Sequence, residues 1–155
     1  MRRALPLLLL VMAVGCATGA RKRQSFMDAV RGYNDGLRWQ RHTHAAAFIP
    51  PAERGDFVDE RAELSEDLRI DDYEVSRVRL DGEGNRAKVQ VVYTWHRDSR
   101  GLVYRTTTLQ EWERHGKLWQ MVEESRVRGE TMPGVPEERR AAPSNQRVSD
   151  PETEK

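Results

Sequence analysis

The spacing of apolar residues changes three times along the chain, and each change marks a different kind of segment. Residues 4–15 form an uncharged, mostly apolar run behind Arg2 and Arg3. From residue 25 to residue 68, apolar residues recur every three or four positions, as on one face of a helix. From about residue 70 they tend to alternate with polar residues, as in half-buried strands. Helices followed by strands predict an α+β fold.

The first helix is expected to begin at Ser25, whose hydroxyl can cap the first turn in an arrangement with Asp28. The apolar residues of its buried face are Phe26, Val30, Tyr33 and Leu37. Gly32 and Gly36 weaken this helix by up to about 1 kcal/mol each relative to alanine. The helical pattern continues to Ala47 and ends before two prolines.

A second, more charged helical face follows these prolines and carries Phe57, Arg61, Leu64 and Leu68. Four strands are then expected, at residues 73–80, 87–96, 103–113 and 118–123. Short polar turns separate them, so the strands should form an antiparallel meander. The alternation in the first strand shifts near Ser76, which indicates a β-bulge.

Residues 129–155 differ in composition from the rest. Four of the seven prolines lie here among Glu, Arg, Ser and Asn. Such a segment buries too little apolar surface to offset the entropy of ordering it. The sequence therefore predicts a disordered tail behind a domain of residues 25–128.

The first fifteen residues are typical of a secretory signal peptide: two cations, a short apolar run and small residues at its end. The run is too short to span a bilayer, which takes about 20 apolar residues. The single cysteine, Cys16, follows directly. An ordinary signal peptidase could also cleave after Gly15, which would leave Cys16 as an incidental thiol.

Ala13-Val14-Gly15-Cys16 resembles the lipobox of bacterial lipoproteins, although alanine stands where leucine is usual. The resemblance implies cleavage after Gly15 and acylation of Cys16, which would anchor the chain in the lipid bilayer. Two or more acyl chains hold a protein stably on a membrane. Ala17, in place of aspartate, resembles the pattern of lipoproteins sent to the outer membrane, facing the periplasm. Residues 16–24 would then be a lipidated tether, whose cations Arg21-Lys22-Arg23 are either solvated or attracted to anionic lipid.

The charge of the chain argues against nucleic acid as a partner. Its net charge is +1, and removing the two leader arginines leaves −1 for residues 16–155. Positive and negative side chains are interleaved, without the basic patch that nucleic-acid binding requires. With one cysteine the chain cannot form an internal disulfide, so packing must stabilise the domain.

Residues 25–125 also resemble the nuclear-transport-factor-2-like (cystatin-like) superfamily. The resemblance rests on the helix around Tyr33 and Leu37-Arg38-Trp39, its continuation at residues 45–48, and the hairpin of residues 110–119 with Trp112 and Trp119. It implies a curved sheet around a long helix, often with a conical pocket. The superfamily includes isomerases, dehydratases, polyketide cyclases and non-catalytic binding or assembly modules, so the fold does not decide the function.

Candidate chemistry is sparse. His42 and His44 would lie about 200° apart on a helix and lack a ligand set beside them, and His96 and His115 flank turns. The acids Asp56, Asp59, Glu60, Asp71 and Asp72 are expected to be solvated. No metal, cofactor or catalytic residue is therefore predicted. The aromatic residues Tyr33, Tyr93, Trp95, Tyr104 and Trp112 either line a pocket or fill the core.

These observations predict a membrane-anchored lipoprotein of the cell envelope that acts as a non-enzymatic binding or assembly module. Its partner would be an envelope protein or a small apolar ligand. A small pocket enzyme of the isomerase or dehydratase type and a purely structural envelope subunit are the alternatives. A deep pocket with a buried Asp or His beside a tyrosine would favour the enzyme, whereas a pocket filled by aromatic rings would count against it.

Overall fold

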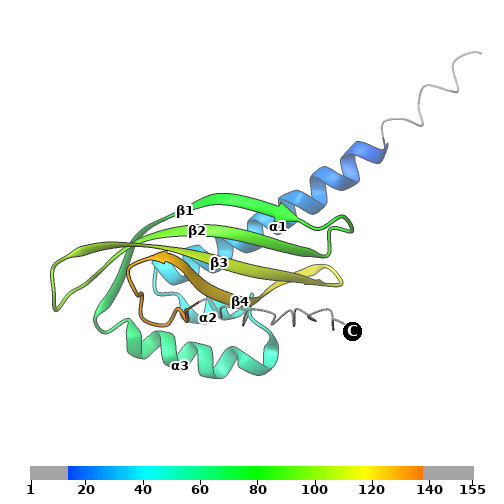
Figure 1. The fold of residues 1–155 in the computed structure, drawn as a ribbon. Coiled ribbons are helices and arrows are strands. Elements are labelled where there is room, and N and C mark those ends of the chain that lie inside the picture. Colours follow the sequence, from blue (N-terminus) through cyan, green and yellow to red (C-terminus); the bar gives the residue numbers. More distant parts are fainter. Residues whose placement is uncertain (1–13, 138–155) are drawn as a thin grey trace, which may run out of the picture.

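The computed structural model describes residues 14–137, in which helices precede a four-stranded sheet (Figure 1). The helices are α1 (Val14–Arg38), α2 (His42–Ala46) and α3 (Arg54–Leu64), with the 3-10 turn η1 (Pro51–Glu53) before α3. The strands are β1 (Leu68–Leu80), β2 (Arg86–Arg97), β3 (Val103–His115) and β4 (Leu118–Gly129). The predicted α+β fold is confirmed. Most of the expected signal peptide and residues 138–155 of the expected tail lie outside the described residues.

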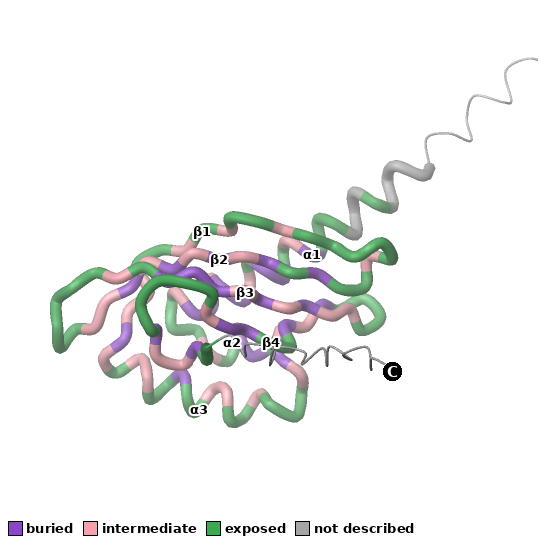
Figure 2. Tube along the Cα trace, in the orientation of Figure 1, coloured by how far each residue is buried: buried purple, intermediate pink, exposed green. Residues whose placement is uncertain are grey.

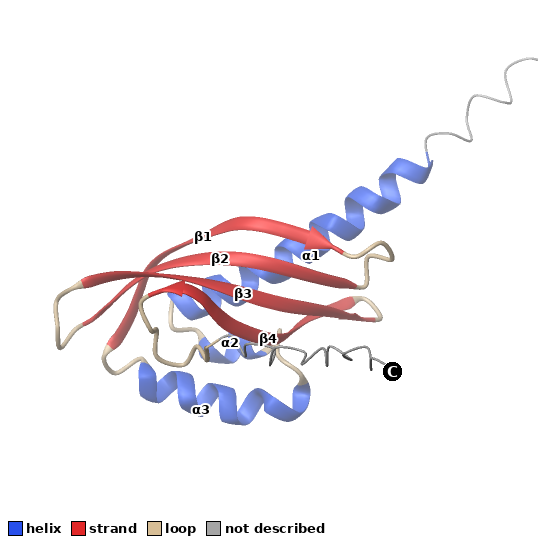
Figure 3. Cartoon of the chain, viewed as in Figure 1, coloured by secondary structure: helices blue, strands red, loops and turns tan. Residues whose placement is uncertain are grey.

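The strands form an antiparallel sheet in the order β1-β2-β3-β4, the meander predicted from the turns (Figure 3). The pairing of β1 with β2 shifts register between Val75 and Arg77, so the bulge expected at Ser76 is confirmed. A second shift lies between Ile70 and Asp72. Such bulges bend a strand and increase its twist.

The core lies between α1 and one face of the sheet, where the buried positions of β2 and β3 face the helix (Figure 2). The predicted inner face of α1 is buried throughout: Phe26, Val30, Tyr33 and Leu37. Alternate residues of β2 meet it from the sheet: Ala87, Val89, Val91, Tyr93 and Trp95. This one-sided burial follows from the period of two along a strand.

Two expectations about the helices were wrong. The first helix does not begin at Ser25, because residues 14–24 are already helical. Alanine, arginine, lysine and glutamine are good helix formers, so the segment expected to be a tether extends α1. The helix also stops at Arg38 and does not continue to Ala47, because Gln40 takes a left-handed backbone conformation with φ of 53°. Among residues 14–137, no helix is long and apolar enough to cross a membrane.

The glycines of α1 have a packing role that outweighs their cost in helix propensity. A Cβ on Gly36 would lie 2.8 Å from the backbone nitrogen of Ala45, and a Cβ on Gly32 would lie 2.4 Å from the ring of Phe48. Both distances are shorter than real Cβ contacts. Glycine at these positions therefore lets α2 and the residues after it lie directly against α1.

The ordered domain extends past the predicted boundary at residue 129. Met132 and Val135 are buried in the core, and the backbone nitrogen of Arg126 donates to the Pro136 carbonyl at 2.7 Å. Residues 130–137 thus stay on the domain, because two apolar side chains are buried in the core and Glu137 forms a parallel bridge with Arg126. The composition of the segment indicated a tail, and this part of the prediction was wrong.

Candidate functional site

A buried carboxylate, Glu124, lies at the centre of a polar cluster between α1 and the sheet. Its side chain is 7% exposed. One oxygen accepts the Tyr33 hydroxyl at 3.0 Å. The other accepts three donors, the Tyr93 hydroxyl at 3.2 Å, the Thr108 hydroxyl at 2.9 Å and the Gln110 amide at 3.0 Å. Four hydrogen bonds from neutral groups therefore compensate the burial of one negative charge.

A β-bulge in β4 points Glu124 inward. Trp112 pairs with Met121 and Glu111 pairs with Glu123, so Val122 is an extra residue in β4. Beyond it the inward positions move by one, and Glu124 faces the core opposite Gln110. Without the bulge, the alternation of Trp119 and Met121 would place Glu123 inside. Re-aiming a side chain in this way is a known use of bulges.

The two tyrosines act as donors to this carboxylate. Burial, together with the negative charge of Glu124, raises the pKa of both Tyr33 and Tyr93 well above that of an exposed tyrosine. Both hydroxyls therefore stay protonated. Tyr93 also contacts the side-chain oxygen of Asn34, and Asn34 donates to the Val30 carbonyl at 2.7 Å. These bonds tie the cluster to α1.

A cavity of about 590 Å³ opens beside this cluster, within the usual size range of small-molecule sites. It lies between α3, β4 and the segment after β4. The polar groups at its base are Tyr33, Glu124 and Arg61. Ile49, Phe57, Met121, Val122 and Pro136 give it apolar walls, and four exposed acids surround it: Glu53, Asp56, Glu60 and Glu123.

Among the described residues, Arg61 is the one cation that lines this cavity, and it is 7% exposed. Its guanidinium donates one hydrogen bond within residues 14–137, from Nη2 to the Gly134 carbonyl at 2.8 Å. Nε is buried without an acceptor in that part of the chain. The guanidinium also lies over the Phe57 ring, 5.4 Å from its centroid. None of the ion pairs among residues 14–137 joins Arg61 to Glu124, although the charge of Glu124 acts on Arg61 electrostatically.

Of the five aromatic residues considered for a pocket, only Tyr33 lines this cavity. Tyr93 and Trp112 are in the core, and Trp95 donates from its indole nitrogen to Thr106 at 2.8 Å. Tyr104 is half-buried and packs on Trp95, with ring centroids 4.8 Å apart. Residues 15 and 16, the proposed cleavage and lipidation positions, fall within helix α1.

Some of the titratable side chains considered in the sequence analysis line the cavity, and others lie elsewhere. Asp56 and Glu60 lie at the cavity, whereas Asp59 does not line it. His42 lies near Arg61, and burial together with that charge lowers the pKa of His42. Within residues 14–137 no three His, Cys, Asp or Glu side chains are arranged to hold a metal ion. The sequence analysis did not predict that Glu124 and Arg61 are buried at the cavity. A bulge predicted in β4 would have indicated that Glu124 faces the core.

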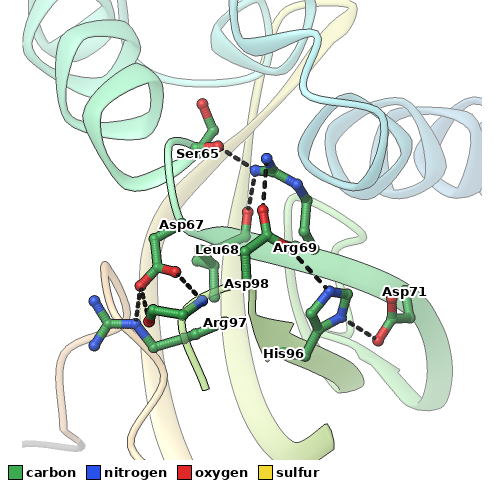
Figure 4. A network of polar contacts seen from close by, with 9 residues as sticks. Ser65, Asp67, Leu68, Arg69, Asp71, His96, Arg97 and Asp98 are labelled. Atoms are coloured by element: carbon green, nitrogen blue, oxygen red, sulfur yellow. Dashed lines mark hydrogen bonds and ion pairs between the residues drawn. The ribbon is translucent and has the colours of Figure 1, made fainter. Parts of the chain in front are cut away.

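A second polar network joins the start of β1 to the turn between β2 and β3 (Figure 4). Asp67 accepts the Arg97 guanidinium at 2.6 Å and both the backbone nitrogen and hydroxyl of Ser99. Asp98 pairs with Arg69 at 2.8 Å. His96 lies between the two acids Asp71 and Asp98, at 3.0 Å from Nδ1 and 3.3 Å from Nε2. Only a protonated imidazole can donate from both nitrogens.

His96 is expected to make stability pH-dependent. The hydrogen bond to Asp71, followed by the smaller contributions of Asp98, raises the pKa of His96 above 6.5. A raised folded-state pKa gives stability that is full below the unfolded value of about 6.5 and is lost as pH rises through the folded value. His96→Gln should therefore lower the melting temperature at pH 5.5 and have a much smaller effect at pH 9. His115→Gln is the control, since its nearest carboxylate oxygen is 3.8 Å away. An equal effect of His96→Gln at both pH values would contradict the assignment.

Comparisons with known proteins define the fold. No protein-family model matches the chain, and no curated protein is significantly similar to it in sequence. The solved structures similar to the chain include a SEC-C motif containing protein from Rhodopseudomonas palustris, a ketosteroid isomerase-like protein from Erwinia carotovora atroseptica, and a putative polyketide cyclase from Xanthomonas campestris pv. campestris. In that order the TM-scores are 0.56, 0.52 and 0.52, and the identities 15%, 15% and 14%.

The matches cover 64%, 66% and 68% of this chain and 77%, 93% and 90% of those chains, in the same order. At this identity the similarity shows the fold alone. The chain has the α+β fold of the nuclear-transport-factor-2-like and ketosteroid isomerase-like proteins.

Proposed function

We propose that the chain is a membrane-anchored lipoprotein of the cell envelope, and that its domain binds a ligand in the cavity between α3 and β4 without catalysing a reaction. The cavity is the observation that supports the binding part of this proposal. It has the volume of a small-molecule site, apolar walls and three buried polar groups at its base. The ligand is a small molecule or a side chain of an envelope protein, since either of them can insert one end into the cavity.

The anchor is argued from the sequence alone. The leader and Cys16 are typical of a lipoprotein, and the proposed location is the outer membrane, facing the periplasm. Cys16→Ser in the full-length chain should release the protein from the membrane fraction or leave it uncleaved, with the acyl mass absent by mass spectrometry. Thr18→Ser is the matched control and should fractionate like the wild type. Unchanged fractionation and mass of Cys16→Ser would refute the anchor.

Binding is tested with the mature chain, residues 16–155 carrying Cys16→Ser, so that no lipid is needed. A set of small fragments of mixed charge is added during ¹⁵N-edited NMR. Fragments that bind should shift the amide signals of Phe57, Met121 and Val122 and leave those of the hairpin at residues 81–85 unchanged. If no fragment shifts the cavity signals selectively, the proposed binding function is wrong.

A small enzyme of the isomerase or dehydratase type is the second candidate, because a buried carboxylate does lie beside a tyrosine at the cavity. Three of the four donors to Glu124 contact Oε1 and one, Tyr33, contacts Oε2, so only one lone pair of Oε2 remains free. This arrangement suits a fixed charge better than a general base, which must reach a proton of the substrate. Deuterium uptake next to the carbonyl of a bound ketone fragment in D₂O, lost in Tyr33→Phe, would favour the enzyme.

A further inference from the structure

The charges around the cavity restrict what it can bind, and they divide into two zones. The outer zone holds four carboxylates, Glu53, Asp56, Glu60 and Glu123, all exposed. Exposed acids alone are ordinary on a protein surface. The inner zone holds two buried charges, the carboxylate of Glu124 and the guanidinium of Arg61. The carboxylate accepts four hydrogen bonds, whereas Arg61 is nine-tenths buried and has only one hydrogen-bond acceptor within residues 14–137.

The inner zone favours a carboxylate. A guanidinium has five N–H donors in a planar fork that matches the two oxygens of a carboxylate. Arg61 uses one Nη2 donor on Gly134, and its Nε is buried without an acceptor among the described residues. The remaining Nη donors are therefore the ones available to a ligand. The buried acid of the cluster, Glu124, accepts from four other donors and forms none of the ion pairs among the described residues. Burying such a group without acceptors is costly, so an incoming carboxylate would gain a strong partner.

The outer zone favours a cation at the other end of the same ligand. An anionic ligand without a positive group would have to pass four carboxylates, which repel it. A ligand with an ammonium or guanidinium group outside would convert that repulsion into attraction. The space between the zones is apolar, with Ile49, Phe57 and Met121 in its walls.

We infer that the cavity binds a small zwitterion, with its carboxylate on Arg61, an apolar chain along Phe57 and Met121, and its cationic end among the acids of α3 and β4. This inference rests on the proposed binding function and specifies its ligand. It replaces the purely apolar ligand expected from the aromatic residues, since those residues lie mainly in the core.

Four probes of equal chain length test the inference on the mature chain: 6-aminohexanoate, hexanoate, hexylamine and hexanol. Amide shifts of the cavity residues are followed by NMR titration at low ionic strength. The zwitterion should bind at least ten times more tightly than each of the other three, because only it satisfies both zones. Raising the salt concentration should weaken its binding, since exposed charges are screened.

Variants separate the two zones. Arg61→Gln should weaken the binding of 6-aminohexanoate and of hexanoate about tenfold and leave the binding of hexylamine unchanged. A double variant with Asp56→Asn and Glu60→Gln should weaken the binding of 6-aminohexanoate and of hexylamine several-fold. Glu63→Gln, an exposed acid of α3 outside the cavity lining, is the matched control for the second pair and should change nothing. The acidic variants change only exposed residues, so they keep the test valid if Arg61→Gln fails to fold.

The outcomes distinguish this inference from the function on which it rests. If hexanol binds in the cavity as tightly as 6-aminohexanoate or more tightly, the inference of a zwitterionic ligand is wrong, while the proposed binding function is supported. Binding of 6-aminohexanoate that neither Arg61→Gln nor the acidic pair weakens would also overturn it. Absence of selective shifts with these probes and with every fragment would refute both.

Discussion

Glu124→Ala is expected to destabilise the domain by about 2–6 kcal/mol, because two buried donors lose their acceptor at about 1–3 kcal/mol each. The substitution leaves the Tyr33 and Thr108 hydroxyls without an acceptor among residues 14–137, whereas Tyr93 and Gln110 keep the side-chain oxygen of Asn34. Each unpaired buried donor retains its cost of desolvation. Burial, the larger cause of the raised pKa of Tyr33 and Tyr93, is unchanged by the substitution, so neither tyrosine relieves the loss by ionising near neutral pH.

Urea unfolding followed by circular dichroism measures this loss. Glu123→Ala is the matched control, because the neighbouring glutamate is exposed and exposed substitutions usually change stability by less than about 0.5 kcal/mol. The slope of the free energy against urea should stay the same in all three proteins. A loss below about 1 kcal/mol for Glu124→Ala would show that water replaces the carboxylate in the cluster.

The fold was predictable because its signals are local. The inner face of α1 follows from four apolar residues at helical spacing, and the inner face of β2 follows from alternation over ten residues. Turns rich in glycine and polar residues separate the strands. A shift in alternation even located the bulge at Ser76. Each of these features is set by residues close together in the sequence.

The candidate site was not predictable, because its features depend on pairing between distant segments. Glu124 faces inward only because Val122 is an extra residue opposite β3, and the alternation before it points to Glu123 instead. Arg61 is buried because Gly134, 73 residues later, covers its guanidinium. The segment with Gly134 was itself assigned to a tail on composition. Composition averages over a segment and does not register two well-placed apolar residues such as Met132 and Val135.

Trp112→Ala is expected to lower the free energy of unfolding by about 3–5 kcal/mol, a large part of the 5–15 kcal/mol of a typical domain. Trp112 is 1% exposed and meets the rings of Phe26 and Tyr33 edge-on, each at 6.0 Å between centroids. Its indole nitrogen donates to Gln110 at 3.2 Å, so the change also disturbs the network around Glu124.

The control for Trp112→Ala is the same change at Trp39, which is 60% exposed and carries only the Arg38 guanidinium over its ring. Trp39→Ala should cost no more than about 1 kcal/mol, the usual contribution of an exposed cation–π contact. The pair also decides between the two roles that the sequence allows for Trp112. A core residue changes the urea midpoint greatly, whereas a pocket residue would change ligand binding at little cost in stability. A small loss for Trp112→Ala together with weaker ligand binding would place the tryptophan in the cavity and contradict the packing described above.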